Sequence, residues 1–299
     1  MLDQLTGFHI EPTNICTLQC PQCARTRFIE QFPRAWRNHQ LDLSALDQFM
    51  DIDLGGKEFD LCGNTGDPIY YAQLFDLITW IHRRGATVHI TTNGSYRTTE
   101  WWNTLAMLLT EKDSVAFSVD GVPDNFTQYR VNADWASIEL GMKVMSTSPA
   151  LTQWKYIPFR FNEHSIEQAR ALSMQLGMDQ FIVTPSDRWD GDDDPLKPIT
   201  YTGAREQTIT LWRKQSNVEI DPLCKKVHNQ HYISAEGFYM PCCYVGDYRF
   251  YYKSEFHKNR SQYDISKTTI SKILENTQNF YGSIEQTAPS YCTYNCPRL

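Results

Sequence analysis

The sequence predicts an α/β fold in which a parallel sheet closes wholly or partly into a barrel. Six strand-like runs alternate with helical stretches, which is typical of repeated βαβ units. The turns rich in glycine, asparagine and aspartate follow the carboxyl ends of these strands. In (β/α) barrels the active site lies on that face. A third observation is the change in composition after Pro185, which predicts a separate C-terminal part.

Each predicted strand is a short apolar or β-branched run that stops at a turn signal. The run Thr87–Thr92 stops at Asn93 and Gly94, and the next strand stops at Asp120 and Gly121. The six predicted strands cover residues 8–12, 58–62, 87–92, 114–119, 154–161 and 180–184.

The stretches between the strands have apolar residues at helical spacing. Four apolar side chains share one face in the stretch 71–84, and Gly85 is expected to end that helix. Asp42 and Ser44 are candidate caps for the helix before it. The predicted helices cover residues 41–50, 71–84, 100–109, 134–145 and 166–176, the last closed by Gly177.

Composition limits the function classes. The 299 residues allow one large domain or two smaller ones, and 41% apolar with 13% aromatic residues is enough for a sizeable core. A net charge of −7 argues against a broad nucleic-acid-binding surface. Neither a signal peptide nor an apolar run of roughly 20 residues is visible, so we expect no membrane association and a reducing, cytoplasmic setting. In that setting, nine cysteines indicate metal binding rather than disulfides.

Three cysteines follow the first predicted strand. Cys16, Cys20 and Cys23 have the spacing C-x3-C-x2-C. Three thiolates this close in sequence can hold three irons of a [4Fe–4S] cluster and leave the fourth iron without a protein ligand. An open coordination position is a place for chemistry. The alternatives are a zinc site that lacks its fourth ligand, or three unrelated thiols.

The triad and the barrel pattern together resemble the radical S-adenosylmethionine (radical SAM) superfamily, whose hallmark is this spacing after strand one. The resemblance implies a partial (β/α)6 TIM-like barrel and a cluster whose open iron binds SAM. It further implies reductive cleavage of SAM to a 5′-deoxyadenosyl radical that abstracts hydrogen from a substrate C–H bond. The protein would hold the cofactor against the substrate and exclude competing reactions. An electron donor such as flavodoxin or ferredoxin is implied as well.

Residues 63–68 resemble the family's glycine-rich motif after strand two, with Asp67 where glutamate is usual. By this resemblance, Thr65, Gly66 and Asp67 are expected to bind the methionyl end of SAM, whose ammonium group suits a carboxylate and backbone carbonyls. Without the resemblance, the segment would be a plain turn.

Further SAM contacts are implied at the ends of later strands. Asn93, Ser118 and Asp120 occupy strand-end positions that resemble those of the family, and Ser118 and Asp120 would meet the carboxylate or ribose region. Arg130 is expected either to pair with the SAM carboxylate or to form a surface salt bridge. Asn162 is expected either to face the ribose or to cap a turn.

One position departs from the family pattern. Many members carry an aromatic residue just before the third cysteine, where it packs near the adenine, and this chain has Gln22. Another side chain must do that packing, or it is absent. Phe28 is a nearby candidate.

The C-terminal third has its own cysteine pattern. Cys224, Gly237 and Cys242 resemble the opening of the SPASM/twitch extension, which carries auxiliary iron–sulfur clusters. Five cysteines remain here, so a twitch form with one [4Fe–4S] cluster fits better than a full SPASM domain. The implied ligands are Cys224, Cys242, Cys292 and Cys296, with Cys243 spare or in place of Cys242. A structural zinc held by the same thiolates is the alternative.

The predicted domains are a barrel at 1–190, a linker at 191–220 and a twitch-type domain at 221–299. The acidic segment 190–195 is read as a solvated loop, because Pro195 falls where an EF-hand needs glycine. His228 and His231 are either ligands or ordinary surface or core histidines. Cys62 is expected to be a buried, unreactive thiol.

The expected function is a radical SAM oxidoreductase that performs a net oxidation or a crosslink in a peptide or small molecule. Dehydrogenation of a sugar or aminocyclitol is the alternative, because the chain starts a few residues before strand one and leaves no room for a leader-peptide-binding domain. A non-catalytic iron–sulfur or zinc protein is the alternative of a different class. The sequence names no catalytic acid or base.

Overall fold

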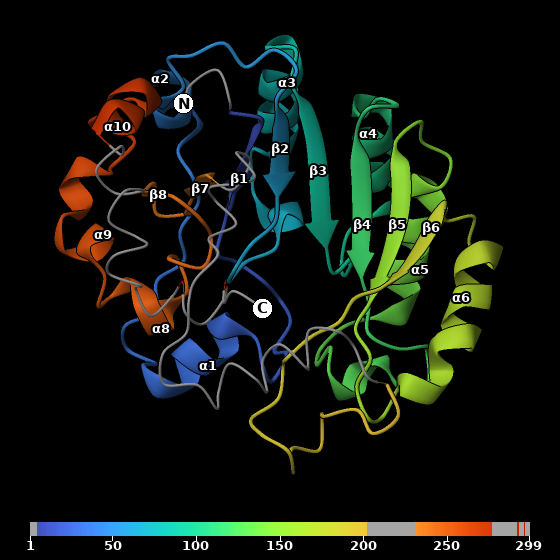
Figure 1. Ribbon diagram of the computed structural model, residues 1–299. Coiled ribbons are helices and arrows are strands. Elements are labelled where there is room, and N and C mark those ends of the chain that lie inside the picture. Colours follow the sequence, from blue (N-terminus) through green and yellow to red (C-terminus); the bar gives the residue numbers. More distant parts are fainter. Residues whose placement is uncertain (1–4, 202–230, 277–291, 293–295, 297–299) are drawn as a thin grey trace. The chain divides into compact units, whose positions relative to one another are not determined.

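The computed structural model describes residues 5–201, 231–276, 292 and 296, in which strands and helices alternate (Figure 1). The chain divides into two compact units. Unit 1 consists of Met1–Ile15, Trp36–Val88 and Trp212–Leu299, and unit 2 of Cys16–Ala35 and His89–Leu211.

The described strands of unit 1 lie in the order β2-β1-β7-β8. β1 pairs in parallel with β2 on one side and with β7 on the other, whereas β7 and β8 form an antiparallel pair. Phe8 and Ile10 of β1 are fully buried, and the Phe8 ring lies 5.4 Å from that of Phe59 on β2. These strands are β1 (Gly7–Ile10), β2 (Glu58–Leu61), β7 (His231–Ile233) and β8 (Tyr239–Met240).

The helices of unit 1 begin where the sequence offers caps. The Asp42 carboxylate accepts the backbone N–H groups of Ser44 and Ala45 at the start of α2, which confirms the predicted cap. Asp51, just after α2, accepts the N–H of Ser271 at the start of α10, so these helices meet there (Figure 1). The helices are α2 (Leu43–Phe49), η2 (Pro68–Tyr70), α3 (Leu74–Arg83), α8 (Tyr248–Tyr251), α9 (Glu255–Lys258), η6 (Arg260–Gln262) and α10 (Ile270–Asn276).

Unit 2 carries parallel strands in the order β3-β4-β5-β6, and the unit boundary runs through β3. Its core includes Trp102, Phe117 and Trp154, which are fully buried. The strands are β3 (Thr87–Thr92), β4 (Ser114–Ser118), β5 (Leu151–Tyr156) and β6 (Gln180–Val183). The helices are α1 (Ala24–Gln31), α4 (Thr99–Leu108), η3 (Phe126–Gln128), α5 (Trp135–Met145), η4 (Glu163–Ser165) and α6 (Ile166–Gln175).

The predicted α/β class is confirmed, with mostly parallel strands in the described residues. Gly85 and Gly177 have positive φ at the ends of α3 and α6, as their predicted role as helix stops requires. The twitch character of the C-terminal part and the domain limits at 190 and 220 stay predictions.

Two predicted boundaries are wrong. The strand expected at 154–161 runs from Leu151 to Tyr156, because the Ile157 N–H donates to the Asp120 carboxylate and Pro158 has no N–H for the ladder. The helix expected at 71–84 starts only at Leu74, because a 3₁₀ turn at Pro68–Tyr70 precedes it.

The sequence analysis missed α1 and all described elements after residue 230, β7 among them. α1 directly follows Cys23 and has a weakly amphipathic sequence, ARTRFIEQ. β7 is only three residues long, too short to show alternation, yet it pairs with β1 and draws part of the C-terminal third into the sheet of unit 1.

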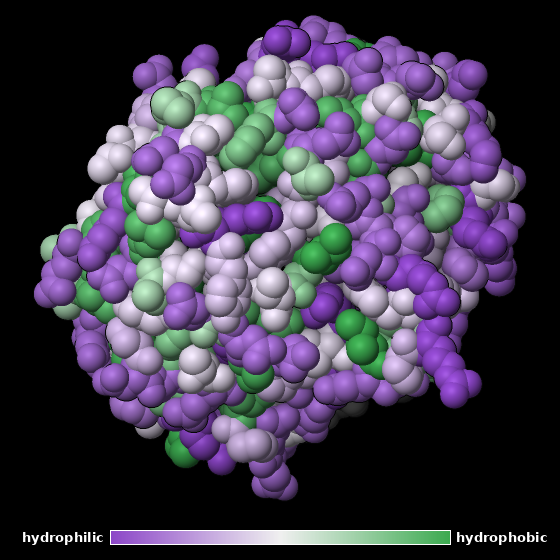
Figure 2. Space-filling model, turned by 180° about the vertical axis from the view of Figure 1, so that it is seen from behind, coloured by the Kyte–Doolittle hydropathy of each residue, from purple (hydrophilic) through white to green (hydrophobic). Residues whose placement is uncertain are grey.

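No helix among the described residues is long and apolar enough to cross a membrane. On the face shown in Figure 2, polar residues predominate and hydrophobic ones lie in small groups between them.

Candidate functional site

The cysteine loop lies between β1 and α1. The Cys16 sulfur accepts hydrogen bonds from the Leu18 N–H (3.4 Å) and from Nδ2 of Asn93 (3.5 Å), which follows β3. Cys23 donates its N–H to the Cys20 carbonyl (3.0 Å) and occupies the N-cap position of α1. A helix N-terminus favours a nearby thiolate. The loop therefore has donors and a dipole that suit anionic sulfur.

An apolar and aromatic group packs against this loop. Leu18, Cys20, Tyr129 and Phe159 form its buried centre. The rings of Tyr129 and Phe159 stack at 4.3 Å, and Phe161 stacks on Phe159 at 5.6 Å. These rings form a candidate apolar wall for an adenine. The sequence analysis did not identify them. Its own candidate, Phe28, is buried in α1.

Charge beside the cysteine loop comes from a buried ion pair. Arg130 Nε lies 2.7 Å from Oδ2 of Asp120, whose side chain is fully buried, while that of Arg130 is 12% exposed. Burial lowers the pKa of Arg130, but the Asp120 carboxylate outweighs this effect and the net pKa is raised. Burial raises the pKa of the Cys20 thiol, and Arg130 acts in the opposite direction. Arg130 thus pairs with Asp120, in a buried salt bridge rather than a surface one.

The side chain of Asn162 is occupied by the backbone of its own turn. Its Oδ1 accepts from the Phe159 N–H (2.6 Å), and its Nδ2 donates to the carbonyls of Asp120 (3.1 Å) and Ile157 (3.0 Å). These bonds match the turn-capping alternative. A ribose contact by Asn162 stays a prediction, as does one by Ser118, which is half-buried at the end of β4.

In unit 1, the glycine-rich loop is attached to a carboxylate that the sequence analysis did not single out. Glu11, which follows β1, accepts at Oε1 from the Thr65 N–H (2.7 Å), the Thr65 hydroxyl (2.8 Å) and the Gly66 N–H (2.8 Å). Its other oxygen accepts from the Tyr232 hydroxyl of β7. Thr65 and Gly66 are thereby held by β1.

Gly66 and Asp67 connect the same loop to the chain just before Cys16. A Cβ atom on Gly66 would lie 1.8 Å from the Thr13 carbonyl oxygen, so only glycine fits there. The Asp67 N–H donates to the Ile15 carbonyl (3.0 Å), and its carboxylate caps η2 through the Ile69 N–H (3.2 Å). The predicted trio thus contacts Thr13 and Ile15, which precede Cys16 in the sequence.

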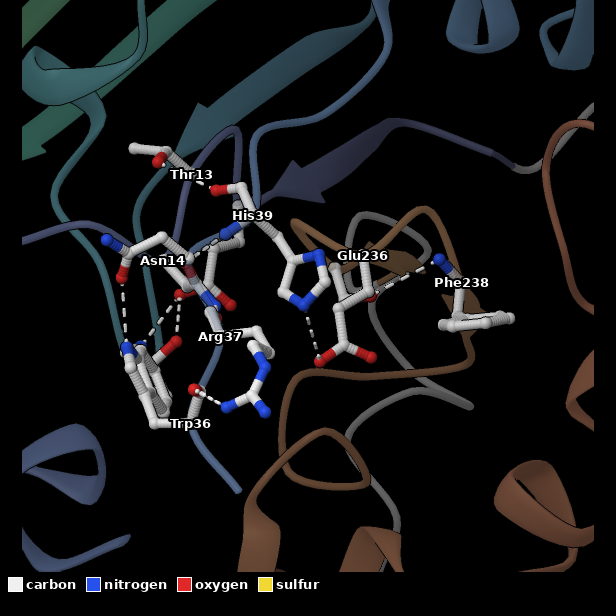
Figure 3. A network of polar contacts seen from close by, with 11 residues as sticks. Thr13, Asn14, Trp36, Arg37, His39, Glu236 and Phe238 are labelled. Carbon is white, nitrogen blue, oxygen red and sulfur yellow. Dashed lines mark hydrogen bonds and ion pairs between the residues drawn. The ribbon is translucent and has the colours of Figure 1, made fainter. Parts of the chain in front are cut away.

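The segment before the cysteines is fixed from its other side as well (Figure 3). Asn14 donates from Nδ2 to the Arg37 carbonyl (2.9 Å) and accepts the His39 N–H at Oδ1 (2.7 Å). Thr13 donates its hydroxyl to the His39 carbonyl (3.0 Å), and the His39 ring faces Glu236 at 3.9 Å. Asn14 therefore sets the path of the chain two residues ahead of Cys16.

Gln22 stands where many family members have an aromatic residue, and its side chain forms two polar contacts here. It donates to the Asp190 carboxylate (3.1 Å) and accepts from Arg27 (2.7 Å), which also pairs with Asp190 at 2.5 Å. Farther along this acidic segment, Leu196 packs against the group around Cys20, and its carbonyl accepts the Arg160 N–H (3.1 Å). The segment 190–195, expected to be a solvated loop, is partly exposed, and its Asp190 is hydrogen-bonded to the cysteine loop at Gln22.

The adjacent Cys242 and Cys243 pack against the same buried apolar group but have different further neighbours. Burial raises the pKa of Cys242 to about 11, and Cys296 acts in the same direction. Burial also raises the pKa of Cys243, and the neighbouring thiols of Cys242 and Cys62 raise it further. Cys242 is thus near Cys296, and Cys243 is near Cys62. The expected burial of Cys62 is wrong, because this thiol at the end of β2 is half-buried.

Among the other predicted ligands, Cys292 is buried and its carbonyl accepts the Cys296 N–H (2.8 Å). His231 is a core histidine of β7, with Nδ1 at 2.7 Å from the Tyr239 hydroxyl. Cys224 and His228 lie outside the described residues.

Within the described ranges, no three His, Cys, Asp or Glu side chains converge closely enough to hold one metal ion. Around a single zinc at about 2.3 Å, tetrahedral sulfurs would have to lie about 3.8 Å apart. A four-iron cluster attaches each thiolate to a different iron, so its ligands need no such convergence. The donor set at the cysteine loop, three thiols with N–H donors and a helix N-terminus, fits such a cluster.

Comparisons with known proteins find a curated relative and several solved structures that are similar to this chain. No family model matches the sequence. The curated "Tungsten-containing aldehyde ferredoxin oxidoreductase cofactor-modifying protein" of Pyrococcus furiosus is 24% identical over 255 residues, which cover 77% of this chain. The chain spans 62% of the length of that relative.

Solved structures share the fold. Streptococcus suis SuiB bound to precursor peptide SuiA has a TM-score of 0.63 at 12% identity, over 94% of this chain and 67% of SuiB. Native anSMEcpe with bound AdoMet and Cp18Cys peptide has a TM-score of 0.56 at 12% identity, over 93% and 82%. BtrN in complex with AdoMet and 2-DOIA has a TM-score of 0.51 at 13% identity, over 99% and 94%. At these identities the likeness shows the fold.

Proposed function

We propose that this protein is a radical SAM enzyme that uses Cys16, Cys20 and Cys23 to hold a [4Fe–4S] cluster with one iron open for SAM. The observation that carries the proposal is the cysteine loop itself, whose Cys16 sulfur accepts hydrogen bonds from Leu18 and Asn93. The fold is shared with structures that contain bound AdoMet, which supports the same cofactor here. When bound, the cluster and SAM supply the oxidising power to remove a hydrogen atom from a substrate C–H bond.

The chain's own residues would position and shield this cofactor pair. Thr65, Gly66 and Asp67 would hold the methionyl end of SAM with backbone carbonyls and a carboxylate. The stacked rings of Tyr129, Phe159 and Phe161 would exclude water on the apolar side of the loop. Arg130 is paired with Asp120, so we assign it to structure and local charge rather than to direct SAM binding.

For the substrate, two classes have support. BtrN, solved with AdoMet and 2-DOIA, matches over nearly the full length of both chains, which favours oxidation of an aminocyclitol-like small molecule. SuiB and anSMEcpe, solved with peptides, favour oxidation or crosslinking of a peptide. In both reactions the substrate would be oxidised by SAM cleavage, and a protein electron donor of the flavodoxin or ferredoxin type would supply the electron that starts this cleavage.

For the C-terminal part, we propose one auxiliary [4Fe–4S] cluster held by Cys224, Cys242, Cys292 and Cys296. The proximity of Cys242 to Cys296 supports this set over one that uses Cys243. A fully ligated cluster would accept the electron that the substrate radical loses when it becomes the oxidised product.

The test is anaerobic reconstitution with iron and sulfide, followed by incubation with SAM and dithionite. We expect 5′-deoxyadenosine and methionine in equal amounts by mass spectrometry. Cys16→Ala should abolish both products, whereas the matched control Cys62→Ala, which removes a thiol outside the triad, should retain them. Absence of 5′-deoxyadenosine from the wild-type protein would favour a non-catalytic iron–sulfur or zinc protein. Peptide libraries and aminocyclitols can then be compared as stimulators of SAM cleavage.

A further inference from the structure

The glycine-rich loop is attached to a single buried carboxylate. Oε1 of Glu11 accepts two backbone N–H groups and one hydroxyl from Thr65 and Gly66, at 2.7 to 2.8 Å. Glu11 is 3% exposed and forms no ion pair within the part of the chain that the structure describes. A buried carboxylate without a cation is stable only when hydrogen bonds satisfy it, and here four donors do so.

These bonds fix which way the peptide groups of the loop point. In a trans peptide unit the C=O points opposite to the N–H, and the described peptide bonds are trans. Because the N–H groups of Thr65 and Gly66 point to Glu11, the carbonyls of Asn64 and Thr65 point away from it. The loop therefore presents two acceptors on the side opposite to Glu11. An ammonium group is a ligand of matching chemistry.

The C-terminal segment that includes Tyr232 and Cys243 also forms hydrogen bonds that hold the glycine-rich loop and Glu11. Tyr232 of β7 donates its hydroxyl to the second oxygen of Glu11, and it packs with Met240 and Val245 in a buried group that Cys242 and Cys243 contact. Nδ2 of Asn64, in the loop, donates to the Cys243 carbonyl (2.8 Å). Two hydrogen-bonded routes thus connect the loop with the segment that carries these cysteines.

We propose that Glu11 is the positioning residue of the SAM-binding loop, and that Tyr232 makes SAM affinity depend on the C-terminal segment. This inference rests on the proposed function, in which residues 65–67 bind SAM. Glu11 does not touch SAM itself. It acts by keeping the carbonyls of Asn64 and Thr65 turned toward the ligand.

The first measurement needs no SAM. Hydrogen exchange by mass spectrometry on reconstituted, SAM-free protein reports the amides of residues 63–68. Wild type should protect Thr65 and Gly66, Glu11→Gln should reduce their protection, and Glu11→Leu should remove it. Glu11→Gln keeps an acceptor oxygen and the size of the side chain, so it still reports if Glu11→Leu does not fold.

The second measurement is the SAM dissociation constant by anaerobic equilibrium dialysis. Glu11→Gln replaces charge-assisted hydrogen bonds by neutral ones and should raise the SAM Kd roughly tenfold. Glu11→Leu removes these hydrogen bonds and should raise the Kd about 100-fold. Tyr232→Phe should raise it about threefold through the loss of one hydrogen bond. The control Ile233→Val lowers stability in the same strand without touching the loop, so its Kd should equal that of wild type.

The outcomes separate the two hypotheses. A wild-type protein that binds no SAM refutes the proposed function, while the exchange data still decide whether Glu11 holds the loop. Wild-type SAM binding with an unchanged Kd in Glu11→Gln and Tyr232→Phe overturns the positioning role. A raised Kd in Ile233→Val equal to that in Tyr232→Phe would also overturn it, because general destabilisation would then account for the effect.

Discussion

The two cysteine groups differ in the charged groups beside them. Cys20 lies beside the buried Arg130–Asp120 pair, and Cys23 stands at the N-terminus of α1. Cys242 lies instead against a buried apolar group that includes Met240, Val245 and Phe256. Both groups touch apolar side chains, but the first also has a buried ion pair and a helix N-terminus beside it.

This difference suits two different tasks. A cluster that exchanges an electron and binds a cationic cofactor changes its charge, and nearby ionised groups and dipoles stabilise such changes. An apolar shell lowers the local dielectric constant, excludes water and sets the reduction potential by burial. Under the proposed function, these surroundings would suit a reactive cluster at Cys16–Cys23 and a shielded one at the C-terminal cysteines.

The largest expected effect separates two adjacent cysteines of the shielded group. Cys242→Ala should lower the iron content from about eight to about four per chain, because it removes a ligand of the auxiliary cluster. Cys243→Ala, its matched control, should keep about eight, because Cys243 is the spare thiol in the proposed ligand set. Iron and zinc analysis of both reconstituted variants is the measurement.

If iron were lost only from Cys243→Ala, the cluster ligand would be Cys243 instead of Cys242. Wild-type protein with about four irons and one zinc would instead make the C-terminal site structural zinc.

The next effect concerns the ion pair beside the cysteine loop. Arg130→Met leaves the Asp120 carboxylate buried without a cation, which should cost about 3–5 kcal/mol. For a chain of this size the melting temperature should fall on the order of 10 °C. Thermal unfolding of the reconstituted protein measures this change.

The control for Arg130 is Arg170→Met, which breaks an exposed pair with Glu167 and should change the melting temperature by roughly a tenth as much. Combining Arg130→Met with Asp120→Asn should recover part of the loss, because no uncompensated charge then remains. If both arginine variants lowered the melting temperature equally, the buried Arg130–Asp120 pair would stabilise the protein no more than the exposed pair does.

Local sequence patterns predicted the cysteine loop, the Asp42 cap and the glycine stops because each depends on residues a few positions apart. The pairing of Asp120 with Arg130 has no such pattern, since both were expected to face SAM. Glu11 carried one signal, a carboxylate within the first predicted strand just before the cysteines. Its partner Tyr232 is 221 positions away, and only the parallel pairing of β1 with β7 brings the two together.

The smallest expected effect lies on the exposed side of the cysteine loop, at Gln22, Arg27 and Asp190. Asp190→Asn weakens an ion pair whose side chains are 33% and 57% exposed, so it should cost about 0.2–1 kcal/mol. Because Asp190 holds the acidic segment to Gln22, the cluster should lose iron to a chelator about twofold faster, which is RT ln 2 or about 0.4 kcal/mol. Asp192→Asn is the matched control, since Asp192 pairs with Lys197 and is 95% exposed. Bleaching at the cluster absorption band measures both variants. Identical rates would show that the charged surroundings of the reactive loop end at the buried Arg130–Asp120 pair.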